Sequence, residues 1–470
     1  MLFNSFPFLF LVLTTLILYY NKNLLKYQIH ILILSSFVFY AYGQPYLLFL
    51  LFVSASINAV VSYVVYFENR HKKKKFYAIA GVIFNLVVLS FFKYSPMFGR
   101  MIEELNSIDG VGEFLIAVPL PIGISFYTFQ GISLVIDLYR NNHQSKCPLF
   151  RVDKDFKKHY VDTIFFISFF PQLVAGPVVK AYQFYPQIRA KFFKDIKFEK
   201  TFKILILGYF LKMVIADNLK DQTFWMAYPY FESFSSLTLV TLLFGYSMQI
   251  FTDFAGYSLI AIGIAKLYGY DLPQNFNYPY ISKSFSEFWT RWHISLSSWL
   301  REYLYIPLGG NRVNKTRVYI NLLIVMLLGG LWHGAALSYM VWGGYHGLLI
   351  MAERYMMNHV RLPSNIFIDS MKIFLVFSLV TLGWLLFKLP EFGQVLAYLE
   401  SMTSNTGVHR KDILMMMFFY SIPVMIYYMN YLLKIKKEKN YLDNSFIYAV
   451  LLFFIVTNSG SSGEFIYFQF

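Results

Sequence analysis

The residue best suited to chemistry in this sequence is His333, which stands in the run GGLWHG between two apolar stretches. An ionisable side chain at membrane depth is costly and is usually retained for a function. The pKa of an imidazole lies near neutral pH, so His333 can act as a general base on a hydroxyl or a thiol. Trp332 beside it offers a flat apolar wall. From the residue alone, a structural histidine that bonds a neighbouring carbonyl is an equal alternative.

Two further histidines flank His333 in the stretch from Asn275 to Gly347. His293, in RWHIS, is a second candidate for chemistry. From the residue alone, the favoured alternative is an interfacial histidine with its ring on lipid and its nitrogen in water. His346 follows His333, and a continuous helix would place these two on different faces. We therefore predict that His346 is structural or makes a helix–helix hydrogen bond.

A carboxylate also lies within an apolar run. Asp253, four residues after Gln249 in YSMQIFTDFAGYS, needs a charged partner or a water-lined cavity if that run crosses a membrane. It can orient a histidine, pair with an arginine or form a purely structural ion pair. The sequence has no HExxH motif, no close cluster of histidines and acids, and no nucleotide-binding or nucleophile-elbow motif. We expect neither a bound metal nor a resident cofactor.

The composition indicates which elements position these residues. Of the 470 residues, 57% are hydrophobic and 14% are charged, whereas a soluble domain carries about a quarter charged residues. We predict an all-α polytopic membrane protein with one domain over residues 1–470. The net charge of +15 lies in short blocks between apolar runs, and cytoplasmic loops beside anionic lipids explain it better than nucleic acid. The one cysteine, Cys147, excludes an internal disulfide.

Apolar runs of spanning length predict about twelve transmembrane helices. The runs are roughly 3–20, 28–43, 45–67, 77–93, 114–137, 204–219, 236–260, 318–334, 336–352, 372–389, 413–432 and 443–457. We expect the first of them to be an uncleaved transmembrane helix and not a signal peptide. Prolines and a glycine in VPLPIGISFYTFQ predict a kinked or broken start to the fifth. Residues 162–179 lie between two basic segments and contain Pro171 and Gly176-Pro177, which favours a re-entrant hairpin over an ordinary span. The positive-inside rule places both termini outside.

The segment from Ser284 to Asn311 is too charged to span a membrane. Its aromatic residues and leucines recur at helical spacing, which predicts an amphipathic helix at the inner face. The residues alone leave two functions open: a membrane-embedded group-transfer enzyme, or a transporter with proton-relay histidines. Transporters often contain inverted repeats with interrupted helices in matching positions. Only one interrupted hairpin and no mate is predicted, which favours the enzyme.

Several long motifs resemble, in the same order, the membrane-bound O-acyltransferase family in its bacterial alginate and peptidoglycan O-acetyltransferase-like branch. They are PLPIGISFYTFQ with IDLYR, FFPQLVAGP, MVIADNL, QIFTDFAGYS, FWTRWHISLSSWLREYLYIPLGGNR, GGLWHG and the terminal FIYFQF. The resemblance covers most of residues 1–350. It implies a helical bundle with a funnel from each face and a catalytic region at about 270–350. By motif match the catalytic histidine is His333, and the family's second active-site histidine is His293.

The resemblance also implies substrates and partners. Acetyl-CoA is the expected donor, and an extracytoplasmic SGNH-like partner is expected to complete transfer to a polysaccharide hydroxyl at a bacterial plasma membrane. The substrate-binding candidates are Trp332, Trp292, Asp253, Arg291 and Arg301. A basic inner surface attracts the CoA phosphates, for which Lys283 and Arg312 are further candidates. The competing family member is the D-alanyl transfer protein of teichoic acid synthesis, which takes its acyl group from a carrier protein.

Overall fold

The computed structural model describes residues 1–104, 110–140, 152–174, 176–359, 363, 365–437 and 443–461. Within these ranges the chain is helical, with two isolated β-bridges as its only strand-like pairing, so the predicted all-α class is confirmed. The chain divides into two compact units, Met1–Ile204 with Ile260–Pro273, and Leu205–Leu259 with Gln274–Phe470. Cys147 and the terminal FIYFQF lie outside the described residues.

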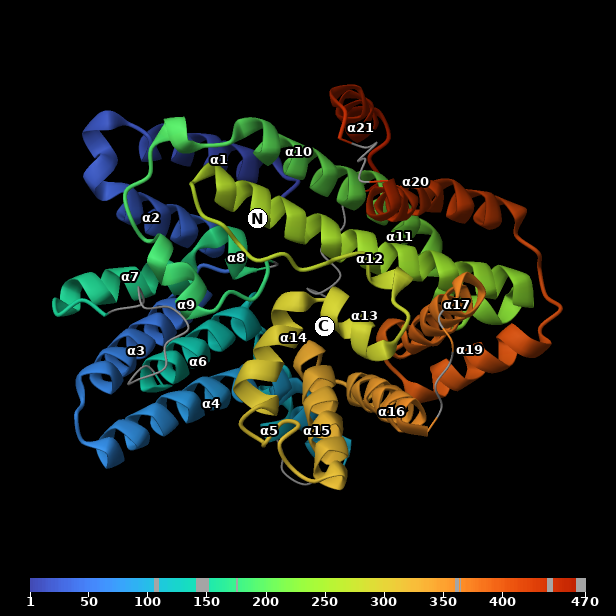
Figure 1. Cartoon of the computed structure of the whole chain (residues 1–470), viewed down its shortest axis with the longest axis horizontal. Helices are drawn as coiled ribbons and strands as arrows, with labels where there is room; N and C mark the ends of the chain where they lie inside the picture. The colour runs from blue at the N-terminus through green and yellow to red at the C-terminus, as the bar shows by residue number, and fades with distance from the viewer. Residues whose placement is uncertain are drawn as a thin grey trace. The chain divides into compact units, whose positions relative to one another are not determined.

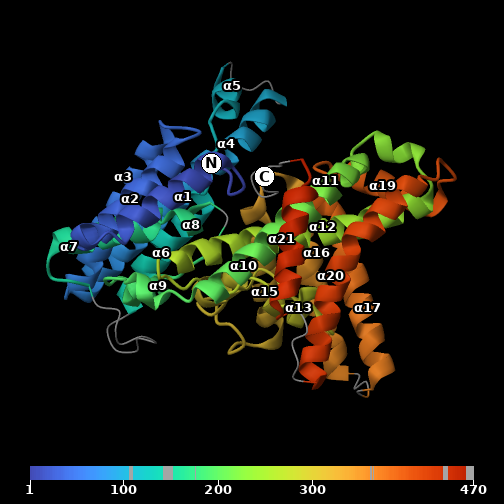
Figure 2. The same cartoon turned by 90° about the horizontal axis from the view of Figure 1, so that it is seen from above.

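Figure 1 shows the helices of the first unit, most of which overlap the predicted apolar runs. They are α1 (Phe6–Tyr19), α2 (Gln28–Ala41), α3 (Leu47–Phe67), α4 (His71–Glu104), α5 (Val111–Ile116), α6 (Ile124–Arg140), α7 (Phe156–Ser168), α8 (Phe170–Leu173), α9 (Ala181–Phe184) and the start of α10 (Phe198–Tyr209). Figure 2 shows α1, α2 and α3 as neighbours. Asn58 of α3 and Asn85 of α4 pair their side-chain amides at 3.1 and 2.8 Å. These reciprocal bonds hold two apolar helices together.

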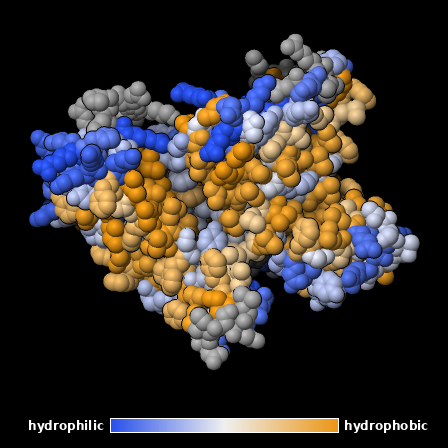
Figure 3. All heavy atoms as spheres, turned by 90° about the horizontal axis from the view of Figure 1, so that it is seen from below, coloured by the Kyte–Doolittle hydropathy of each residue, from blue (hydrophilic) through white to orange (hydrophobic). Residues whose placement is uncertain are grey.

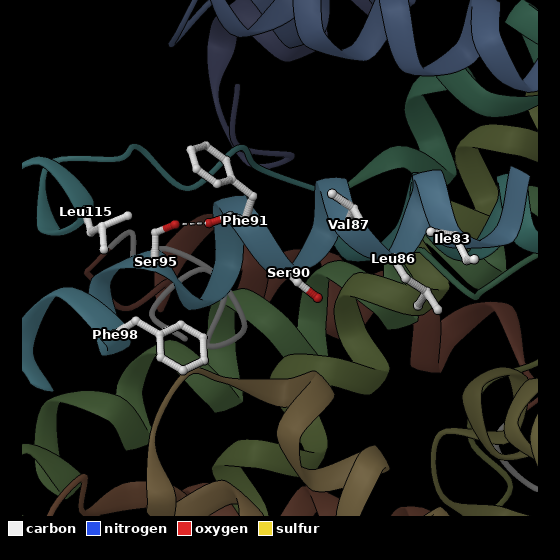
Figure 4. A pocket seen from close by; sticks show the side chains of 8 residues that line it. All are labelled: Ile83, Leu86, Val87, Ser90, Phe91, Ser95, Phe98 and Leu115. Atoms are coloured by element: carbon white, nitrogen blue, oxygen red, sulfur yellow. Dashed lines mark hydrogen bonds between the residues drawn. The ribbon is translucent and has the colours of Figure 1, made fainter. Parts of the chain in front are cut away.

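Helix α4 contains 34 residues and carries Pro96 in its interior. Proline removes one backbone donor from a helix, and nearby the hydroxyl of Ser95 donates to the carbonyl of Phe91 (Figure 4). A groove of about 640 Å³ runs along α4 and reaches Leu115 of α5. The side chains that line it are mainly apolar, and Figure 4 shows them following α4. Such a surface suits a helix that faces lipid.

Both predicted interruptions in the first unit fall at helix breaks. The broken start of the fifth run is confirmed, because α5 ends at Ile116 and α6 begins at Ile124. Gly123 precedes α6 with φ 79°, and a methyl group on it would overlap the carbonyl oxygen of Leu173. Residues 162–179 are not one helix either, since α7 and α8 are followed by non-helical backbone at residues 176–179. A re-entrant course through the membrane stays a prediction.

The second unit begins with the end of α10. It continues with a π-helical segment (Phe210–Ala216), α11 (Asp217–Thr223), α12 (Ser236–Leu267), α13 (Phe285–Arg291), α14 (Ile294–Leu300), a second π-helical segment (Arg301–Tyr305), α15 (Lys315–His333), α16 (Leu337–His359), α17 (Ile366–Gly383), α18 (Leu385–Lys388), α19 (Phe392–Ser404), α20 (Lys411–Lys437) and α21 (Ser445–Thr457). Helix α19 was not predicted. Helices α15 and α16 lie side by side (Figure 1). Two of the three unit boundaries fall within α10 and α12, and the third follows Pro273, outside any helix.

Seven helices among the described residues are long and apolar enough to cross a membrane. They are Lys22–Ala41, Leu47–Phe67, His71–Glu104, Ser236–Leu267, Lys315–His333, Ile366–Lys388 and Lys411–Ile435, and α1 and α21 are apolar but shorter. Large apolar side chains are exposed on many helices, and Figure 3 shows broad hydrophobic areas beside hydrophilic ones. A multi-pass membrane protein is therefore confirmed, whereas the number of twelve crossings stays a prediction.

The segment from Ser284 to Asn311 is not a single amphipathic helix, so that prediction is wrong. Two short helices, α13 and α14, meet at Trp292 and His293, and His293 has a φ of 43°. The side chains that produced the amphipathic pattern are buried in the second unit: Phe285, Phe288, Trp292, Leu296 and Trp299. The periodicity identified a buried face correctly, but other parts of the protein cover that face.

Candidate active site

His333 is the last residue of α15, and Gly334 follows it in an extended conformation. Only 4% of His333 is exposed. Its ring centroid lies 5.0 Å from Trp332, 5.2 Å from Trp342 and 5.3 Å from Phe387. The imidazole is thus embedded among aromatic rings, where a low local dielectric strengthens its interactions with a polar reactant.

His293 caps the N-terminus of α14 and is fully buried. The alternative of an interfacial histidine with a nitrogen in water is therefore wrong. Its ring centroid lies 6.3 Å from that of His333 and 4.6 Å from that of Phe254 in α12. Burial lowers the pKa of His293 to about 3, so the ring is neutral at physiological pH. The fold thus brings the imidazoles of His293 and His333, which are far apart in sequence, close together.

A cavity of about 220 Å³ lies beside His333 within the second unit. Its wall includes α15 from Leu322 to His333, a length of about 16 Å along the helix. Trp289 of α13 and Trp342 of α16 also line it, as does Arg301 at the start of the second π-helical segment. Arg301 is exposed while His333 is buried. The cavity therefore connects a basic group near the surface with the embedded imidazole.

Glycines set how closely α15 and α16 approach each other next to His333. A methyl group on Gly330 would overlap the carbonyl oxygen of Tyr339 and lie 3.0 Å from Gly343. A methyl group on Gly343 would overlap the carbonyl oxygen of Met326. Because the obstructing atoms belong to the backbone, no side-chain movement relieves the overlap. This contact fixes where the end of α15 lies relative to Trp342.

We expect Gly330→Ala to destabilise the protein, by about 1–3 kcal/mol, because the added methyl group must push the two helices apart. Gly344→Ala is the matched control, since its nearest obstacle is the flexible end of Leu327 at 3.3 Å. Thermal unfolding of the purified protein in detergent measures the difference. Equal unfolding temperatures for the two variants would contradict the inferred contact.

The other predicted binding residues are spread over the second unit. Trp332 contacts both histidines, with its ring centroid 5.9 Å from that of His293 and 5.0 Å from that of His333. Trp292 packs against Phe276 and Trp384, at 5.0 and 4.9 Å, and does not line the cavity. Arg291 forms an ion pair with Glu287 and donates to the carbonyl of Asn277 at 3.1 Å. Of the five candidates, the cavity includes only Arg301. Substrate contacts for all five stay predictions.

Asp253 takes part in a buried ion cluster formed with Lys212 and Asp217. The ammonium of Lys212 lies 2.7 Å from a carboxylate oxygen of each aspartate. All three residues are at most 3% exposed. Lys212 belongs to the first π-helical segment, Asp217 begins α11, and Asp253 lies in α12. The partner of Asp253 is thus a lysine, whereas the sequence analysis named a histidine, an arginine or a purely structural ion pair as the alternatives.

His346 lies on α16, and its ring is also fully buried. It stacks on Phe288 at 6.2 Å and contacts Trp289 and Trp342 at 5.3 and 4.9 Å. Neither ring nitrogen hydrogen-bonds to another described residue, so the predicted helix–helix hydrogen bond is not found there. Trp342 contacts both His346 and His333. His346 is therefore a packed neighbour of the cavity, and it is absent from the cavity wall.

The sequence analysis missed three residues that matter at this site. Trp289 and Trp342 line the cavity, but a tryptophan in an apolar chain gives no signal that separates a cavity wall from a core. Lys212 did give a signal, because a lysine five residues before Asp217 interrupts an apolar run. A buried cation among apolar residues calls for acidic partners. That reasoning would have linked Lys212 to Asp253.

The geometry suits acid–base chemistry at an uncharged group of a reactant. A buried imidazole can remove a proton from a hydroxyl group, and the aromatic rings around it exclude water. An exposed arginine at the cavity can hold an anionic part of the same reactant. No group of three or more histidine, cysteine or acidic side chains suited to a metal ion occurs within the described ranges. The arrangement can therefore support transfer of an activated acyl group.

Comparison with known proteins gives a consistent result. The sequence model of the MBOAT, membrane-bound O-acyltransferase family matches residues 110–389. A protein of Pseudomonas aeruginosa named probable alginate O-acetylase AlgI is 36% identical over 410 residues, covering 86% of this chain and 75% of its own length. A peptidoglycan O-acetyltransferase of Helicobacter pylori is 34% identical over 396 residues, 80% of this chain and 74% of its own.

The name of a more distant relative describes a different activity. A teichoic acid D-alanyltransferase of Bacillus subtilis is 30% identical over 286 residues, which cover 58% of this chain and 69% of the relative. The matched family region contains both His293 and His333, together with the whole wall of the cavity. This chain belongs to the membrane-bound O-acyltransferase family.

Proposed function

We propose that this O-acyltransferase moves acetyl groups from cytoplasmic acetyl-CoA to an extracytoplasmic polysaccharide, with His333 as the general base. The observation that carries this proposal is the buried His333 at a cavity that also reaches the exposed Arg301. Two relatives named as acetyl-transferring enzymes are more than 30% identical over at least 80% of the chain. Acetyl is therefore the acyl group that the proposal names.

The reaction needs little beyond a base and good positioning. His333 takes the proton of the acceptor hydroxyl, and the oxygen attacks the thioester carbonyl. The carbon–sulfur bond then breaks, and the proton passes to the departing thiolate. A thioester is activated enough for this exchange, so a neutral imidazole in a water-poor site suffices.

The donor's phosphates require cations, and the candidate cations differ in their partners and positions. Lys283 is paired with Asp369 at 2.7 Å, and Arg291 is paired with Glu287 at 2.9 Å. Arg301 lines the cavity and is exposed. Arg312 is also exposed, but it does not line the cavity. We assign the phosphate contact to Arg301, because its guanidinium can reach the phosphates while the thioester lies beside His333.

A partner completes the proposed pathway outside the membrane. An extracytoplasmic SGNH-like acetyltransferase would receive the acetyl group and place it on the polysaccharide hydroxyl. The names of these relatives include alginate and peptidoglycan, the glycans that receive the acetyl group. We therefore place the reaction at a bacterial plasma membrane and expect a glycan as the acceptor, without naming the glycan.

Reconstituted vesicles test this function directly. Labelled acetyl-CoA is supplied on the cytoplasmic side, with the candidate partner and glycan on the other side. We expect labelled glycan whose formation needs the protein and does not need a proton gradient. Labelling only from a D-alanyl carrier-protein thioester would favour the teichoic acid activity instead. Solute flux driven by a proton gradient, without acyl transfer, would support a transporter and contradict the proposal.

We expect His293→Ala to lower the rate of acetyl transfer strongly without abolishing it. The ring of His293 lies 6.3 Å from the ring of His333, so it acts beside the base and shapes the same site. The measurement is the initial rate in the vesicle assay, compared with the wild type at equal protein in the membrane. An unchanged rate would remove His293 from the active site.

A further inference from the structure

Asn275 makes an unusual set of contacts around His293. Its side-chain oxygen Oδ1 accepts from Nδ1 of His293 at 3.0 Å and from the hydroxyl of Ser295 at 2.8 Å. The backbone N–H of Ser295 points to the same oxygen at 3.3 Å. The amide nitrogen of Asn275 donates to the hydroxyl of Ser258 in α12 at 3.1 Å. Asn275 is 1% exposed, so these bonds form away from water.

The backbone of the same residue holds the strained turn between α13 and α14. His293 has a φ of 43°, in the left-handed region that a residue with a side chain rarely adopts. The N–H of Ile294 donates to the carbonyl of Asn275 at 2.9 Å, and the N–H of Asn277 donates to the carbonyl of Arg291 at 2.9 Å. These bonds lie on either side of His293. They keep in place a conformation that costs about 1–3 kcal/mol by itself.

The contacts also determine which nitrogen of His293 carries the proton. The N–H of Ser295 can only donate, so the Asn275 atom that it faces must be the oxygen. An amide oxygen can only accept, so Nδ1 of His293 must be the donor to it. In a neutral ring the other nitrogen, Nε2, is then the basic one. The hydrogen-bond geometry thus selects one tautomer without reference to any substrate.

We propose that Asn275 is a positioning residue for acyl transfer, which holds His293 in its strained turn with the proton on Nδ1 and Nε2 basic. This inference rests on the proposed function, because it assigns His293 a part in that reaction. It goes beyond that function by naming a residue and a protonation state. Asn275 acts through His293 and touches no reacting atom.

The ring of His293 is packed between aromatic side chains, and Asn275 is its hydrogen-bond partner at Nδ1. Phe254 of α12 and Trp332 of α15 pack against the ring at 4.6 and 5.9 Å. The titratable group that faces it is His333 at 6.3 Å. Asp253, the neighbour of Phe254 in α12, is held by Lys212 at 2.7 Å.

Imidazole ¹⁵N chemical shifts test the tautomer in the full-length protein. Histidine-labelled wild type and Asn275→Ala are compared, with His293→Ala used to assign the signal. We expect the Nδ1–H tautomer in the wild type and loss of that preference in Asn275→Ala. Wild-type protein with the proton on Nε2, or an unchanged tautomer in Asn275→Ala, would overturn the proposal. This readout holds whether or not the protein transfers acetyl groups, so it separates the two proposals.

Kinetics supply the second arm. Asn275→Ala is expected to lower kcat by about 10- to 100-fold with little change in KM, because a misplaced catalytic group slows chemistry more than binding. Asn275→Asp keeps the accepting oxygen and should restore most of kcat at neutral pH, where the ring of His293 stays uncharged. Its carboxylate favours imidazolium, so protonation of His293 should occur about 1–3 pH units higher than in the wild type, as followed by the same ¹⁵N signal.

Asn277→Ala is the matched control in the same loop. Asn277 contributes its backbone N–H and carbonyl to the turn, and alanine keeps both groups. We expect wild-type kcat and the wild-type tautomer for this variant. If Asn275→Ala does not fold, Asn275→Asp still decides the question. If His293 became protonated at the same pH in a folded Asn275→Asp protein as in the wild type, the inferred contact between residue 275 and Nδ1 of His293 would be wrong.

Discussion

Replacing His333 with alanine is expected to reduce acetyl transfer by about 10²- to 10⁴-fold, the usual contribution of a general base. The reason is the position of the ring, 4% exposed and part of the cavity wall that also includes Arg301. The protein should still insert and fold, because the rings of Trp342 and Phe387, which surround His333, keep their contact with each other. Glycan acetylation in cells and the vesicle assay both measure the loss.

His346→Phe is the matched control for this experiment. His346 is as buried as His333, and both rings contact Trp342. Its nitrogens make no hydrogen bond to described residues, so phenylalanine suits the aromatic surroundings. We expect transfer close to the wild-type rate. If His333→Ala kept its activity while folded, the base assignment would be wrong, and loss of activity in His346→Phe would move the site towards α16.

The second large effect is expected on stability. Lys212→Met should lower the free energy of unfolding by about 3–5 kcal/mol, since removing one partner leaves uncompensated buried charge. Two carboxylates, Asp217 and Asp253, would lose the ammonium that lies 2.7 Å from each. Thermal unfolding in detergent and the amount of protein in the membrane measure this. An unfolding temperature equal to that of the wild type would contradict the cluster.

Two comparisons make the experiment specific to buried charge. Adding Asp217→Asn and Asp253→Asn to Lys212→Met removes all three charges, and we expect this triple variant to recover much of the lost stability. Lys158→Met breaks a pair with Asp153 of the same 2.7 Å length, but that pair is largely exposed. Exposed pairs contribute little, so Lys158→Met should unfold near the wild-type temperature.

The elements were largely predictable because membranes restrict them. Runs of apolar residues gave helices such as α3 and α12 near their observed bounds, since a lipid-embedded backbone must satisfy its own hydrogen bonds. The break between α5 and α6 followed from Pro119, Pro121 and Gly123. The turn at His293 was not predictable, because the residues there have no proline or glycine and the strain is held by Asn275, which is distant in sequence.

The site was only partly predictable. His333 drew attention because an ionisable residue stands out in an apolar run, and the same reasoning found Asp253. The periodicity of Phe288, Trp292 and Leu296 showed a buried face but did not show what covers it. The cavity wall depends on tertiary packing between α13, α14, α15 and α16. Amino-acid composition therefore cannot predict this cavity.

The ion cluster has a consequence for how the chain is made. Lys212 and Asp217 leave the ribosome five residues apart, so this pair can form before α12 has been synthesised. Helix α12 then brings Asp253 into one of the apolar segments that can cross the membrane. Alone, that segment would carry an unpaired carboxylate into lipid, at a cost of several kcal/mol. Its insertion therefore depends on the preceding segment, and the order of synthesis supplies the lysine before the aspartate that needs it.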